Sequence, residues 1–195
     1  MQRRSFILKT SAVLAAGGLA LAGCTTTSDP AVTTAENEAK RRKIDAEVNS
    51  AMKRLFSTVR GAQELVGKAR GVLVFPSVIQ AGFVFGAQYG EGALRVGDSS
   101  IGYYSTVSGS FGAQIGAQSK ALFFLFMTKD AFDDFRNSSG WAAGGNASVA
   151  IVKVGANGVI DTTTAMTPVE VFVLTNAGLM GDLSLAGTKV TRLNI

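Results

Sequence analysis

Closely spaced strand-like segments occupy most of the chain from Gly71 onward. Short turns separate them, and only one short helical segment, 129–137, interrupts the series. Parallel neighbours need a crossover of about a dozen residues or more, usually a helix. The spacing therefore argues against a parallel α/β sheet. We expect an α+β fold: a mainly antiparallel β sandwich or barrel-like sheet, preceded by an N-terminal amphipathic helix.

Apolar runs and turn residues predict the individual strands. The run 121–128 is continuously apolar, which is typical of a central strand. Asn157-Gly158 lies between two strand-like runs and predicts a hairpin. Strands are expected at 71–75, 81–90, 92–98, 102–109, 111–119, 121–128, 146–154, 159–166, 169–176 and within 182–194.

A short helix is predicted at 129–137. Thr128, directly before it, is a residue type that caps helix N-termini. Phe132 and Phe135 are three residues apart and share one helix face. We expect both rings to point into the core.

Glycines recur inside the predicted strands, at Gly82, Gly86, Gly90 and Gly92 among other positions. Even spacing places these four on one sheet face if the stretch is regular. Glycine weakens a strand unless the sheet bends or another group approaches closely. The glycines therefore either curve the sheet and let backbones pack, or frame a groove that admits a ligand. We favour the structural role, because glycine kinks are the usual device for curving a sheet.

Residues 34–69 are predicted to be helical. Thr33 and Glu36 fit a capping box, and Gly61 or Gly67 is a candidate break between two helices. The apolar stripe recurs every three or four residues: Ile44, Val48, Met52, Leu55, Val59, Ala62, Val66 and Ala69. Such a stripe either docks on the rest of the domain, which we favour, or lies in a membrane surface.

The first 23 residues have the layout of a secretory signal: a positive start, a short apolar run and small residues before a cut. Leu21-Ala22-Gly23-Cys24 resembles the lipobox of bacterial lipoproteins. We expect residues 1–23 to be removed and Cys24, the single cysteine, to be lipidated. Residues 24–33 are then a flexible tether. The domain follows at 34–195, helical over 34–69 and β-rich over 70–195.

The export route and destination are expectations from resemblance. RRSFILK, residues 3–9, is similar to the twin-arginine export motif, and an ordinary Sec signal accounts for it equally well. Thr25, not Asp, follows the cysteine. By resemblance to lipoprotein sorting in Gram-negative cells, this favours an outer-membrane lipoprotein that faces the periplasm or the cell surface.

The composition excludes several kinds of chemistry. The chain has no histidine, and lipidation would consume its only thiol. Ser-His-Asp and Cys-His catalysis and histidine-ligated zinc are therefore excluded. The sequence has no P-loop, EF-hand spacing or recognisable nucleophile–base pair. We expect no enzyme, no cofactor and no metal, and no nucleic-acid partner because basic residues are not interleaved with aromatics.

Positive charge is concentrated near the start of the domain. Three of the 19 Lys and Arg residues lie within 1–23, so 16 remain against 14 Asp and Glu. Residues 34–70 hold nine basic and five acidic residues. A basic helix near a lipid anchor would face anionic headgroups, although a solvated helix face is the common alternative. The candidates for phosphate contacts are Lys40, Arg41, Arg42, Lys43, Lys53, Arg54 and Arg60.

Four ordered blocks resemble the SYLF domain, the lipid-binding domain also called the Ysc84-type actin-binding domain. They are 69–94, 111–135, 144–155 and 176–190. With the lipobox and tether, the chain resembles the bacterial lipoprotein branch of this family. The resemblance implies binding of membrane lipid, with phosphoinositides and actin as eukaryotic partners. Gln80 stands where the family often has a lysine, so one expected basic contact is missing.

The predicted function is that of a non-enzymatic, lipid-anchored envelope protein whose SYLF-like domain binds phospholipid membranes through anionic headgroups. The alternative is a structural or protein-interaction module held at the membrane by its acyl anchor alone. Actin is not an expected partner in a bacterial envelope.

Overall fold

The structure is a computed structural model, and the residues it describes are 30–82, 85–111, 118–143, 145–146, 148–152, 167–175, 178–179, 185 and 187–195. Cys24, the signal segment and the predicted hairpin at Asn157-Gly158 lie outside these residues. By their contacts, residues Thr34–Ile195 form one compact unit.

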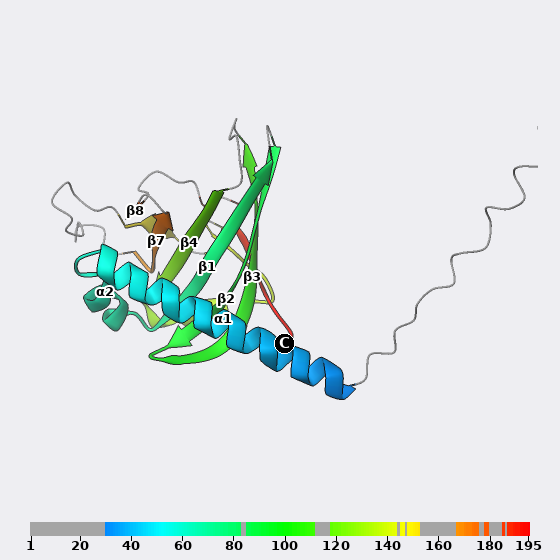
Figure 1. Ribbon diagram of the computed structural model, residues 1–195. Helices are drawn as coiled ribbons and strands as arrows, with labels where there is room; N and C mark the ends of the chain where they lie inside the picture. The colour runs from blue at the N-terminus through cyan, green and yellow to red at the C-terminus, as the bar shows by residue number, and fades with distance from the viewer. Residues whose placement is uncertain are drawn as a thin grey trace, which may run out of the picture. The chain divides into compact units, whose positions relative to one another are not determined.

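One curled sheet forms the centre of the fold (Figure 1). Its strand order is β5-β9-β3-β2-β1-β4-β7-β6, and β8 pairs with β7. The strands are β1 (Gly71–Gly82), β2 (Phe85–Val96), β3 (Ser99–Phe111), β4 (Gln118–Phe126), β5 (Trp141–Ala142), β6 (Val149–Ile151), β7 (Val169–Thr175), β8 (Gly178–Leu179) and β9 (Lys189–Arg192). Among the described pairings only β6–β7 is parallel. The α+β prediction with a barrel-like, mainly antiparallel sheet is confirmed.

Several predicted strand boundaries are wrong. β1 continues through Pro76 to Gly82, whereas the prediction ended this strand at Phe75. β4 runs without a break from Gln118 to Phe126, whereas the prediction separated 111–119 from 121–128. The predicted strand 81–90 contains a chain reversal, because β1 pairs with β2 in the register Gly82↔Gly86. The break expected after Gly90 is absent, since β2 continues to Val96. Residues 112–117 of the predicted strand 111–119 lie outside the described residues.

The helical segment divides at a glycine. Helix α1 (Pro30–Thr58) and helix α2 (Ala62–Lys68) are separated by Gly61, whose φ of 87° is left-handed. Glycine adopts this conformation without the steric cost that a Cβ imposes. Because α1 begins at Pro30, Thr33 lies inside the helix, and its predicted N-cap role is wrong.

The sheet carries an apolar cluster on each face, because alternate residues of a strand point to opposite faces. In β4, Phe124 and Phe126 join the cluster that also holds Trp141. Helix α3 (Lys129–Asn137) packs there, with Phe132 and Phe135 buried and Thr128 accepting a hydrogen bond from the Ala131 backbone N–H, as predicted.

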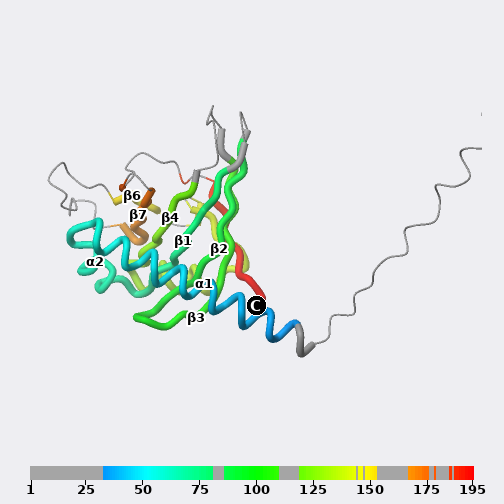
Figure 2. The backbone as a smooth tube through the Cα atoms, in the orientation of Figure 1, coloured from blue at the N-terminus to red at the C-terminus, as the bar shows by residue number. Residues whose placement is uncertain are grey.

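The opposite face of the sheet is covered by α1 and α2 (Figures 1 and 2). Phe123 and Leu125 of β4 pack there against the buried helix side chains. These are Ile44, Val48, Ala51, Leu55, Val59, Ala62 and Leu65, while Met52, Val66 and Ala69 are partly buried. The apolar stripe therefore docks on the sheet, which is the first of the two alternatives.

Close backbone approach explains two of the strand glycines. β1 shifts register between Val74 and Ser77, around Pro76, and β2 lies opposite this irregularity. A Cβ on Gly92 would lie 2.0 Å from the Val74 carbonyl oxygen, and one on Gly90 would lie 2.8 Å from the Ser77 carbonyl oxygen. Any larger residue would push the strands apart, so these positions support the structural role.

Candidate functional site

Six of the seven candidate cations lie on α1, whose apolar side packs against the sheet, and Arg60 follows the end of this helix. Residues two positions apart on an α-helix are separated by about 200°, and residues eleven apart lie nearly on one line. Ile44 and Leu55 mark the buried line of α1. Arg42 and Lys53, each two residues before one of them, therefore mark the exposed line. Both side chains are in contact with solvent.

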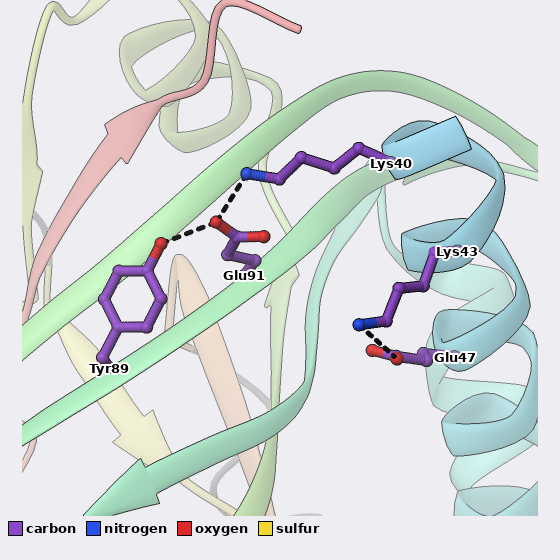
Figure 3. A network of polar contacts seen from close by, with 5 residues as sticks. All are labelled: Lys40, Lys43, Glu47, Tyr89 and Glu91. Atoms are coloured by element: carbon purple, nitrogen blue, oxygen red, sulfur yellow. Dashed lines mark hydrogen bonds and ion pairs between the residues drawn. The ribbon is translucent and has the colours of Figure 1, made fainter. Parts of the chain in front are cut away.

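Lys40 is held in a network between the helix and the sheet (Figure 3). Its Nζ lies 2.8 Å from Oε1 of Glu91 on β2, and the Tyr89 hydroxyl donates to the same oxygen at 2.6 Å. The side chains of Lys40 and Glu91 are 37% and 26% exposed. This contact joins residues 51 positions apart and ties α1 to the sheet.

The network shifts the pKa of both acidic partners. Burial alone would raise the pKa of Glu91, but the hydrogen bonds from Lys40 and Tyr89 outweigh it and lower the pKa. The hydrogen bond to Glu91 raises the pKa of Tyr89 to about 12, with burial adding to the effect. At neutral pH the carboxylate is ionised and the phenol protonated, so Lys40 already has an anionic partner.

Within the described part of the chain, the ion pairs of Arg42 and Lys43 are intrahelical and lie at the surface. Arg42 lies 3.6 Å from Glu38, and Lys43 lies 4.0 Å from Glu47. Exposed pairs of this kind contribute about 0.3–0.5 kcal/mol. Both cations can therefore exchange their partners for phosphate oxygens at little cost.

Arg41 and Arg54 point toward the domain. Arg54 donates to the Leu174 carbonyl oxygen of β7 at 3.4 Å. Arg41 is partly buried, and within the described residues its Nε is enclosed without a hydrogen-bond partner. A headgroup would reach these two guanidinium groups less readily than it would reach Arg42 or Lys43.

Lys53 and Arg60 are exposed, and neither has an ion pair with any residue that the structure describes. The seven candidates therefore do not form one cluster. Arg42, Lys43, Lys53 and Arg60 are open to solvent, and we call these four the outer cations. The other three contact the sheet or lie partly buried beside it.

Sequence reasoning missed the polar contacts that fix α1 to the β2–β3 hairpin. Asp45 accepts hydrogen bonds from the Ser100 hydroxyl at 2.6 Å and the Tyr103 hydroxyl at 2.8 Å. Arg95 donates to the Asn49 side chain and to the Asp98 carbonyl oxygen. Burial, with the hydrogen bond to Asp45, raises the pKa of Tyr103. No local sequence signal pairs residues more than 45 positions apart.

Two of the cavities that adjoin α1 are nearly equal in volume. One of about 580 Å³ lies beside the Lys40 network and is lined in part by Lys43, Ile79 and Tyr89. The other, of about 590 Å³, lies between α1, α2 and the turn after β2. Both volumes fall in the range of about 300–1,000 Å³ typical of small-molecule sites.

The residues that the structure describes include no helix that is both long and apolar enough to cross a bilayer. Among the same residues, the Asp and Glu side chains form no group of three or more that could hold a metal ion.

One known family model matches the second half of the domain. A search of curated proteins returns no match. Residues 107–194 match the Ysc84 family model, described as a Las17-binding protein actin regulator. The matched range begins near the end of β3 and includes β4, α3, β7 and β9, but not α1 or α2. Over residues 107–194 the chain is therefore similar to the Ysc84 (SYLF) domain family.

Proposed function

We propose that this protein is a non-enzymatic, lipid-anchored envelope protein whose domain binds the surface of phospholipid membranes through anionic headgroups. The outer cations Arg42, Lys43, Lys53 and Arg60 make the contact. The observation that carries the proposal is their position: α1 buries its apolar stripe in the sheet and leaves Arg42, Lys43 and Lys53 in solvent, and Arg60, just after the helix, is exposed as well.

The docked stripe determines how such binding would work. Ile44, Val48 and Leu55 are at most 3% exposed, so they are committed to the core. A helix that keeps this packing cannot bury the same side chains in a bilayer. Binding is then electrostatic, with ammonium and guanidinium groups on phosphate oxygens, and salt weakens it.

The anchor is part of the same proposal. Cys24 carries the lipid after cleavage of residues 1–23, and the protein resides on the outer membrane. An anchor near the start of α1 would keep the outer cations close to the membrane, where each basic residue contributes about 1 kcal/mol on an anionic surface. Because the proposed protein is exported, actin, which the family description names, is not the partner that we propose.

Vesicle flotation of residues 25–195, which lack Cys24, tests the headgroup contact. We expect the domain to float with vesicles rich in phosphatidylglycerol and cardiolipin at low salt, and not with zwitterionic vesicles. Salt at 1 M shortens the Debye length to about 3 Å and should release the protein. A domain that stays at the bottom in every condition would leave the anchor as the only attachment and would favour a protein-interaction module.

A charge-matched pair of variants locates the surface. Lys53→Glu with Arg60→Glu should abolish flotation at an ionic strength where the parent floats. The control is Lys129→Glu with Lys189→Glu, which changes the net charge equally on α3 and β9. Equal loss in both double variants would mean that net charge, and not the outer cations, governs binding.

A further inference from the structure

The 590 Å³ cavity between α1 and α2 is lined in part by apolar side chains that are only partly buried by the core. Met52 and Phe56 of α1 and Val66 of α2 contribute to it. All three are only partly buried, although they pack against the cluster under the helices. Removing large apolar side chains from water is favourable, so a ligand that covers them is bound more tightly. We call this space the α2 cavity.

Gly67 leaves the wall of the α2 cavity open. It lies inside α2, where glycine costs about 1 kcal/mol relative to alanine. A Cβ added at Gly67 would meet no atom within 4 Å, and the residue does not have a left-handed φ. Neither packing nor backbone conformation therefore requires glycine here. Its missing side chain leaves space in the cavity.

Charged groups at the α2 cavity favour an anion. Lys53 and Arg95 both line it, with Asp98 as the one carboxylate among its lining residues. Arg95 uses its guanidinium on an amide oxygen and a backbone carbonyl, so these contacts leave its positive charge without a carboxylate partner. Lys53 has no ion pair with any described residue. The lining thus combines an apolar wall with a net positive charge.

We propose that the α2 cavity binds one molecule of a single-chain anionic amphiphile, with its acyl chain against Met52, Phe56 and Val66 and its anionic head on Lys53 and Arg95. A free fatty acid and a lysophospholipid share this chemistry. The site is distinct from adsorption to a membrane surface, because it takes a monomeric lipid from solution and does not require a bilayer. This inference therefore goes beyond the proposed function and does not depend on it.

The test is fluorescence titration of residues 25–195 with dansylaminoundecanoic acid, kept below its micellar concentration. This chain segment contains the whole compact unit and every contact described above. We expect saturable binding at one site. Displacement by laurate, by lauroyl lysophosphatidylglycerol and by uncharged monolauroylglycerol then distinguishes the sources. An anionic competitor should displace the probe at least tenfold better than the uncharged one, and equal displacement by all three would overturn the charge assignment.

Filling the cavity tests its location. Gly67→Leu should weaken probe binding at least tenfold while the thermal midpoint stays equal or rises, because leucine is the better helix former. Gly109→Leu is the matched control: a Cβ at Gly109 also meets no atom within 4 Å, and this residue of β3 is outside the cavity lining. Unchanged probe affinity in Gly67→Leu, or no binding by the parent, would overturn the proposal.

Separate experiments can contradict membrane binding through the outer cations and lipid binding in the α2 cavity. Gly67→Leu keeps all four outer cations, so it should still float with anionic vesicles. Lys53→Glu should weaken binding of the anionic probe severalfold without weakening that of a neutral competitor. Loss of vesicle flotation with intact probe binding would contradict the proposed function alone.

Discussion

At the scale of residues, the buried carboxyl group of Glu170 leads to a specific prediction about stability. Glu170 lies on β7, paired with Leu125 of β4 and Ala150 of β6, and is 1% exposed. Among the described residues, its Oε1 atom has no hydrogen-bond partner. Burial raises the pKa of this carboxyl, because the charged form loses its hydration.

Replacing this carboxyl by an amide should stabilise the fold at neutral pH. A raised pKa in the folded state means that Glu170 favours folding at pH values below its unfolded pKa and loses that contribution as the pH rises through the folded value. Glu170→Gln should therefore increase the free energy of unfolding at pH 7 by about 1 kcal/mol, since an unpaired buried charge costs more than a neutral amide. Urea denaturation at pH 7 and pH 4 measures the difference, which should shrink at pH 4.

The exposed Glu64 of α2 supplies the control for this experiment. It forms a surface pair with Lys68, so Glu64→Gln should change the free energy of unfolding far less than Glu170→Gln does at pH 7. A loss of stability in Glu170→Gln at pH 7 would contradict the expectation, because it would mean that the ionised carboxylate has a favourable partner.

The candidate cations could be named from the sequence, but the sequence did not show which of them are exposed and which contact the sheet. Lys40 and Arg42 are two residues apart in one basic run, yet only Lys40 reaches Glu91 on β2. That outcome depends on the rotation of α1 and on the register of a strand far along the chain. The anchoring role of Asp45 was hidden for the same reason, because its partners Ser100 and Tyr103 are brought near only by the fold.

At the scale of elements, the break between α1 and α2 depends on one backbone conformation. Gly61 has a φ of 87°, where a residue with a Cβ is strained by about 1–2 kcal/mol. Gly61→Ala should destabilise the domain by roughly that amount, measured by urea denaturation. Gly67→Ala, six residues later and without a left-handed φ, should be neutral or stabilise by up to about 1 kcal/mol. The same sign for both substitutions would contradict this account.

Local patterns predicted the elements well where one signal dominated. The apolar run 121–128 supplies most of β4, which begins earlier, at Gln118, and ends at Phe126. Thr128 caps α3, and Phe132 and Phe135 of that helix are buried. Predictions failed where two signals competed. In AGFVFGAQYG the strand pattern continues across a reversal, so periodicity alone did not place the end of β1 at Gly82. The very short β5 and β8 carry too few residues for any period.

At the scale of the whole molecule, α1 serves two surfaces at once. Its inner side completes the apolar cluster on one face of the sheet, and its outer side presents cations to solvent. Polar contacts at Lys40, Asp45 and Asn49 flank the apolar contact and fix the rotation of the helix. The core therefore determines which charges α1 exposes, and the proposed membrane binding would require no rearrangement of the domain.

A covalent link between α1 and the sheet tests that claim. Ser100 Oγ and Asp45 Oδ1 are 2.6 Å apart. In residues 25–195, which contain no cysteine, Asp45→Cys with Ser100→Cys provides two thiols that a short bifunctional reagent can join. If the docked helix binds through its outer cations, the cross-linked protein should float with anionic vesicles as well as the same variant with its thiols separately alkylated. If instead the stripe must leave the sheet and enter the bilayer, cross-linking should abolish flotation while the alkylated control still floats, because only the link prevents undocking.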